Sequence, residues 1–102
     1  YLAKINNGRV PRLYSALDKK SKWGRWSPIS YVNNRIQPPT LVMWSGGRNR
    51  DRISKRFANA MISAGNNVIQ FAGDSYNHLS INSAIGGSNA VTRAVDKFLT
   101  RL

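Results

Sequence analysis

The residue of this chain best suited to proton-transfer chemistry is His78, the only histidine in the 102-residue sequence. It follows a short apolar run, residues 68–71, and the polar segment 72–77. Loops at the ends of strands often display functional side chains on a rigid scaffold. Imidazole gains and loses a proton near neutral pH, so a histidine at such a place suits the role of a general base. The alternative is a surface or half-buried histidine without a chemical role.

The composition argues against several other kinds of site. The chain has no cysteine, which excludes thiolate nucleophiles, disulfides and cysteine-based metal sites, and is compatible with a reducing intracellular compartment. One histidine without cysteine is too few for an ordinary zinc site, and four scattered carboxylates offer no acid–base pair. Ser45-Gly46-Gly47 with Arg48 and Arg50 can offer amides and cations to a phosphate but lacks the Lys-Ser/Thr ending of a P-loop. We therefore expect no metal and no cofactor.

The basic charge of the chain points to an anionic partner. Sixteen Lys and Arg stand against four Asp and Glu, which gives a formal net charge of +12. Such an imbalance is typical of chains that lie against phosphates or another anionic surface. The alternative is ordinary solvated charge, although acidic residues normally balance it. Two basic clusters hold the candidate nucleic-acid-binding residues: Lys19, Lys20, Lys22 and Arg25 in the first, and Arg48, Arg50, Arg52, Lys55 and Arg56 in the second.

Residues 1–39 have an irregular pattern with turn signals and contain all four prolines of the chain. Within them, residues 10–17 are compatible with a short helix. Trp23 and Trp26 flank Gly24 among cations, where indole rings either stack on bases or act as apolar plugs at the edge of a sheet. We favour the plug, and we interpret the segment as an irregular lead to the rest of the domain.

The elements that must position His78 lie in residues 40–102. The apolar run 40–45 shows no alternation, which predicts a strand buried on both faces. Helical spacing of apolar residues predicts a helix over 51–64, ended by Gly65, and residues 67–71 form a second short strand. Strand, helix and strand in this order indicate parallel strands with a right-handed crossover.

A final helix is predicted over residues 89–101, with Ser88 as its cap. It is expected to bury its apolar side chains against the sheet: Val91, Ala94, Val95, Phe98 and Leu99. Together, residues 40–102 form a βαβα core with a short parallel sheet. The whole chain, residues 1–102, is therefore expected to be one α/β domain or a fragment of one.

Several segments in this order carry a family resemblance: Ser27-Pro28-Ile29-Ser30-Tyr31-Val32, Pro38-Pro39-Thr40-Leu41-Val42-Met43-Trp44-Ser45-Gly46-Gly47, Ser63-Ala64-Gly65, the strand 67–71, Asn77-His78-Leu79-Ser80-Ile81 and the final helix. Over residues 26–102 the chain resembles the C-terminal part of the α/β-hydrolase fold, particularly its esterase and lipase-like branches. In that family, the loop after the first of these strands carries the acid of the catalytic triad, and the loop after the second carries its histidine. The resemblance implies a carboxylic ester hydrolase with His78 as the catalytic histidine.

Two departures from the family bear on activity. The position of the family's acid holds Arg48, and the nearest carboxylate, Asp51, is either the acid or a residue that favours the start of a helix. Asp74 is a further candidate, although a loop aspartate more often bonds its own turn. The chain also lacks a G-x-S-x-G elbow, because Gly86-Gly87-Ser88-Asn89-Ala90 ends in Ala and follows the histidine. We interpret that segment as a flexible lead with a helix cap. The chain therefore contains no expected nucleophile and is not self-sufficient for catalysis.

Two functions follow from these observations. One is a serine hydrolase of carboxylic esters whose nucleophile lies on a missing N-terminal half or on a second protein chain, which would also cover the open sheet edge. The other is a non-catalytic, hydrolase-derived basic protein that binds RNA or forms a structural part of a ribonucleoprotein such as a ribosome. The chain begins with Tyr1 rather than Met, so we expect a processed or partial chain. No stretch approaches the ~20 apolar residues of a transmembrane helix.

Overall fold

The computed structural model of the chain describes residues 23–33, 35–47 and 49–102. It divides into two units, Tyr1–Asn33 and Asn34–Leu102. The helix predicted over residues 10–17 lies outside the described residues, as do Lys19, Lys20, Lys22 and Arg48.

The described part of the first unit contains two short helices. α3 spans Trp23–Trp26, and the 3-10 helix η2 spans Pro28–Tyr31. Pro28 suits the start of η2 because the N–H that proline lacks would have no partner in a first turn. The Tyr31 hydroxyl donates a hydrogen bond to the backbone carbonyl of Arg25, which links the two helices.

The second unit is built on a parallel sheet that has two strands among the described residues. β1 spans Thr40–Ser45 and β2 spans Val68–Gly73, with Thr40 opposite Val68 and Ser45 opposite Gly73. This confirms a mixed α/β class with parallel strands. β2 continues two residues beyond the predicted end at residue 71, because Ala72 and Gly73 still pair with the end of β1.

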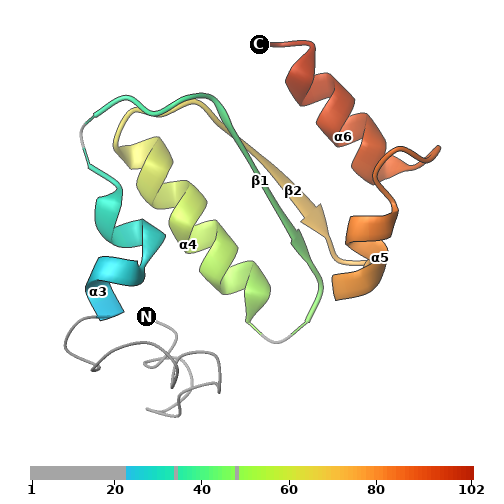
Figure 1. Cartoon of the computed structure of the whole chain (residues 1–102), viewed down its shortest axis with the longest axis horizontal. Coiled ribbons are helices and arrows are strands. Elements are labelled where there is room, and N and C mark those ends of the chain that lie inside the picture. The colour runs from blue at the N-terminus through green and yellow to red at the C-terminus, as the bar shows by residue number, and fades with distance from the viewer. Residues whose placement is uncertain (1–22, 34, 48) are drawn as a thin grey trace. The chain divides into compact units, whose positions relative to one another are not determined.

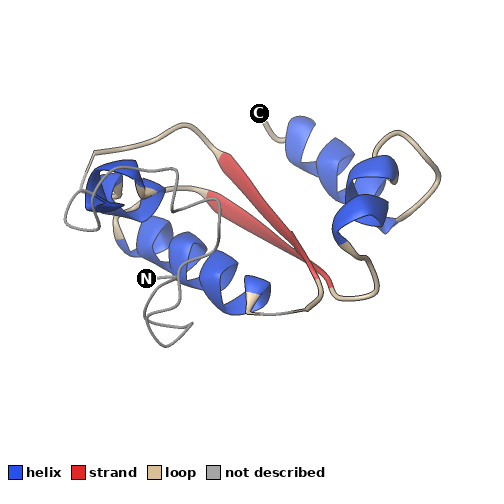
Figure 2. Cartoon of the chain, turned by 60° about the horizontal axis from the view of Figure 1, so that its bottom comes forward, coloured by secondary structure: helices blue, strands red, loops and turns tan. Residues whose placement is uncertain are grey.

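Three helices accompany the sheet. α4 spans Arg50–Ser63, α5 spans His78–Ser83 and α6 spans Ala90–Leu99. In Figures 1 and 2, α4 covers one face of the sheet, while α5 and α6 lie on the other side. The sequence pattern predicted α4 and α6 but not α5. In the described ranges, no helix is both long enough and apolar enough to span a bilayer.

The apolar side of α4 faces the sheet. Ala58 and Met61 are buried, and the opposite face of the helix is exposed: Arg52, Lys55, Arg56 and Asn59. Gly65 follows the helix with a φ of 88°, a left-handed conformation that glycine adopts without a steric penalty.

Three expectations about packing and capping are wrong. β1 is not buried on both faces: Trp44 and Ser45 are buried, but residues 40–43 are only half-buried, because α6, on the side opposite α4, packs against β2. In α6, Val91 is fully buried, whereas Leu99 at the helix end is 54% exposed. The cap of α6 is Asn89 rather than Ser88, since the Asn89 side chain accepts from the Thr92 N–H at 3.0 Å.

Candidate functional site

The carboxyl ends of the two strands are held together by backbone hydrogen bonds beyond the ladder itself. The Gly46 N–H donates to the carbonyls of Gly73 at 3.1 Å and Tyr76 at 3.0 Å. A Cβ added at Gly46 would lie 2.6 Å from the Asp74 carbonyl oxygen, and one at Gly73 would lie 2.8 Å from the Trp44 carbonyl oxygen. Glycine at both positions therefore allows the loops after β1 and β2 to contact each other.

His78 is the first residue of α5, not a loop residue as the sequence pattern predicted. The helix begins with a capping box: the Asn77 side chain accepts from the N–H groups of Leu79 at 3.0 Å and Ser80 at 2.8 Å, and the Ser80 hydroxyl accepts from the Asn77 N–H at 2.8 Å. The polar residues 74–77 cross from β2 to this cap. The cap fixes the backbone of His78 while its side chain is exposed.

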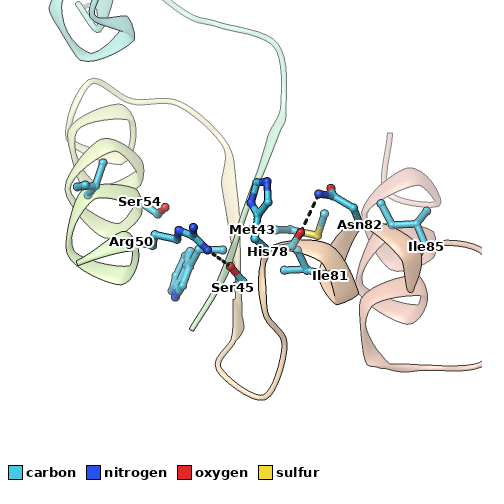
Figure 3. Close-up of a pocket in the computed structure, with 10 residues that line it drawn as sticks. Met43, Ser45, Arg50, Ser54, His78, Ile81, Asn82 and Ile85 are labelled. Carbon is cyan, nitrogen blue, oxygen red and sulfur yellow. Dashed lines mark hydrogen bonds between the residues drawn. The ribbon is translucent and has the colours of Figure 1, made fainter. Parts of the chain in front are cut away.

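An open pocket of about 300 Å³ lies at this edge of the sheet, and His78 is one of its lining residues. β1, α4 and the segment 78–85 form its walls (Figure 3). The polar lining consists of Ser45, Arg50, Ser54, His78 and Asn82, and the apolar lining of Met43, Trp44, Ile53, Ile81 and Ile85. His78 therefore lies at the common carboxyl edge of the two parallel strands.

Arg50 connects α4 to the end of β1 inside this pocket. Its Nη1 donates a hydrogen bond to the Ser45 hydroxyl at 3.0 Å. Ser45 is itself buried at the last position of β1, so its hydroxyl is a fixed acceptor. Among the described residues, no hydrogen bond joins the His78 imidazole to the hydroxyl of either Ser45 or Ser54.

The candidate acids do not pair with His78. Asp51 lies in the first turn of α4, where a negative side chain interacts favourably with the helix dipole, and it does not line the pocket. Asp74 is exposed in the turn after β2. Within the described ranges, neither carboxylate forms a hydrogen bond or ion pair with the imidazole. No group of three metal-ligating side chains occurs there either.

The structure separates the predicted cations into different environments. Arg52, Lys55 and Arg56 are exposed on the outer face of α4, which we call the basic face, whereas Arg50 lines the pocket. The Lys55 ammonium lies 6.0 Å from the centre of the Trp44 ring, at the outer limit of a cation–π contact. Arg25 is exposed in the first unit.

Trp44 forms a buried wall of the pocket, with 6% of its surface exposed. Its Nε1–H is fully buried and has no hydrogen-bond partner among the described residues. A buried donor without an acceptor loses its hydration without compensation. The ring is therefore held by packing.

The sequence reasoning missed the roles of the Ser45 and Ser54 side chains and the separate position of Arg50. Arg50 and Ser54 are four residues apart on a helix, and Phe57 and Met61 continue the same side of α4 toward the sheet. The sequence spacing places Arg50, but not Arg52, on the side of α4 that faces the sheet. This spacing could have separated Arg50 from the other cations.

No family model, curated protein or solved structure matches the chain. What the geometry defines is a small mixed α/β unit with a histidine-containing pocket at the carboxyl edge of its sheet.

Proposed function

We propose that the chain is the C-terminal part of an α/β-hydrolase-like carboxylic ester hydrolase and supplies His78 as its general base. One observation carries the proposal: an exposed histidine at the start of α5 lines a pocket at the carboxyl edge of two parallel strands. Ligand sites in open α/β sheets lie at this edge. An exposed imidazole without a hydrogen bond to another described side chain is available to accept a proton.

The nucleophilic serine and the carboxylate that orients the imidazole are supplied, in this proposal, from outside the described residues. His78 accepts the proton of the serine hydroxyl as its oxygen forms a bond to the ester carbonyl carbon. It then returns that proton to the departing alcohol oxygen as the ester C–O bond breaks. Water repeats the cycle and releases the acid.

The test is hydrolysis of p-nitrophenyl butyrate by the chain and by its reading frame extended upstream of Tyr1. We expect turnover in the extended protein only, and a loss of about a hundredfold or more in kcat for His78→Gln. Lys97→Gln, an exposed substitution on α6, is the matched control. Full activity of His78→Gln, or an upstream frame without a serine elbow and without turnover, would contradict the proposal.

The basic face of α4 favours a second candidate, binding of RNA without catalysis. Arg52, Lys55 and Arg56 are exposed along one side of the helix in a chain of formal net charge +12. Cations in such a row neutralise phosphates and release counterions. Fluorescence anisotropy with a short single-stranded RNA, repeated over a range of salt concentrations, measures this contribution.

Replacing all three basic-face residues by Gln should weaken RNA binding and lower the slope of log affinity against log salt by about 2. Arg93, Lys97 and Arg101 are three exposed cations on or beside α6 and give a charge-matched triple control. Equal effects of the two triple variants would show that RNA binding does not depend specifically on the basic face of α4. Absence of RNA binding at moderate salt would rule out the candidate.

A further inference from the structure

We propose that the pocket binds a carboxylate that carries a short aliphatic chain, with Arg50 as its anion-binding residue. The inference does not rest on ester hydrolysis, because it concerns binding of the free acid. It follows from the shape, the charge and the apolar walls of the pocket.

The charge of the pocket is unbalanced in favour of an anion. Arg50 is the one residue of fixed positive charge in its described lining, and no lining residue is acidic. Among the described residues, the guanidinium makes a single hydrogen bond, from Nη1 to the Ser45 hydroxyl. Since a guanidinium carries five N–H donors in a planar fork, donors are left for a carboxylate.

Ser45 holds this cation at one end of the pocket. Its hydroxyl belongs to a buried residue at the end of β1 and accepts from Arg50 at 3.0 Å. The guanidinium is therefore oriented before a ligand arrives, which lowers the entropic cost of binding. Figure 3 shows Arg50 and Ser45 together on one side of the pocket.

The opposite side of the pocket suits an aliphatic chain. Ile81 and Ile85 lie there, across the pocket from Arg50, and Met43 lies between the two sides (Figure 3). Ile85 is 51% exposed, so an aliphatic ligand would remove apolar surface from water. The volume of about 300 Å³ is at the small end of ligand pockets, which favours a short chain.

Isothermal titration calorimetry of the intact chain with hexanoate tests the proposal, with hexanol and inorganic phosphate as the two comparison ligands. Hexanoate should bind more tightly than either, because hexanol lacks the charge and phosphate lacks the chain. In ¹H–¹⁵N spectra, the shifts should centre on Ser45, Arg50 and Ile81. Equal binding of phosphate or hexanol would overturn the proposed ligand class.

Arg50→Gln should weaken hexanoate binding by about tenfold to a hundredfold, the range for a hydrogen bond to a charged group. Arg52→Gln removes the same charge from the same helix outside the pocket and should change binding less than twofold. Arg50→Lys retains the charge without the fork and should lie between them. Equal effects of Arg50→Gln and Arg52→Gln, or a larger effect of His78→Gln than of Arg50→Gln, would overturn the assignment of Arg50.

Discussion

Arg50 at the first position of α4 and Ser45 at the last position of β1 are joined by a hydrogen bond of 3.0 Å. The bond spans the connection between strand and helix, in which Gly47 and Asn49 have positive φ values of 97° and 63°. A side-chain link across this turn fixes where the helix begins relative to the sheet. The same bond holds the Arg50 guanidinium in the lining of the pocket.

Loss of this link should have a small and measurable effect on stability. Ser45→Ala removes the acceptor, and we expect the free energy of unfolding in urea to fall by about 0.5–1.5 kcal/mol. Ser54→Ala is the control, because the Ser54 hydroxyl lines the same pocket without a hydrogen bond to another described residue. An equal loss for both variants would mean that the hydroxyl of Ser45 has no special role.

The capping box of α5 predicts a larger effect at Asn77. Asn77→Ala leaves the N–H groups of Leu79 and Ser80 without their acceptor and should cost about 0.5–2 kcal/mol, whereas Asn77→Asp should retain most of the stability. Asn59→Ala, at an exposed interior position of α4, should be neutral or slightly stabilising. Urea unfolding monitored by circular dichroism measures all three. A neutral Asn77→Ala would show that α5 does not depend on this cap.

Close backbone contact predicts that Gly46 does not tolerate a side chain. In Gly46→Ala the new methyl group meets the Asp74 carbonyl oxygen, which is backbone and cannot rotate away. We expect a loss of about 1–3 kcal/mol, the range for overpacking. Gly24→Ala is the control, since its nearest neighbour would be 3.9 Å from the new Cβ. If Gly46→Ala unfolds at the same urea concentration as the wild type, the predicted contact between the two loops is wrong.

Because the indole N–H of Trp44 has no partner among the described residues, we expect Trp44→Phe to lower stability much less than Trp44→Ala. Trp44→Phe removes a buried donor that has no partner and keeps most of the ring, so stability should change by less than about 1 kcal/mol. Trp44→Ala leaves a cavity and should cost about 3–5 kcal/mol. Thermal unfolding of both variants gives the comparison. A Trp44→Phe variant as unstable as Trp44→Ala would indicate that the N–H is bonded.

The parts of the fold that could be predicted are those with a clear period. The apolar run 40–45, the 3.6-residue spacing of α4 and the final helix all lie close to their predicted positions. The burial of β1 could not be predicted correctly, because a continuous apolar run indicates two covered faces whether or not a helix covers the second one. Residues 40–43 are half-buried, since α6 packs against β2.

The start of α5 escaped prediction because its residues favour loops. Asn77, Ser80, Asn82 and Ser83 compete with a helix by bonding to the backbone, and in this segment those same side chains bond within the helix or cap it. Ser80 takes the position where a capping box usually has Glu or Gln. The location of His78 at the sheet edge was predictable from the order of the strands. The contact between Arg50 and Ser45 could be predicted only by working out which side of α4 carries Arg50.

The bonds that begin α5 have a consequence for how this chain can change over generations. They come from the side chains of Asn77 and Ser80 and from backbone groups, and the ring of His78 contributes to none of them. A replacement at position 78 can thus change the chemistry of the pocket lining without removing the bonds that begin α5. The side chain at position 78 and the local fold can therefore change independently of each other.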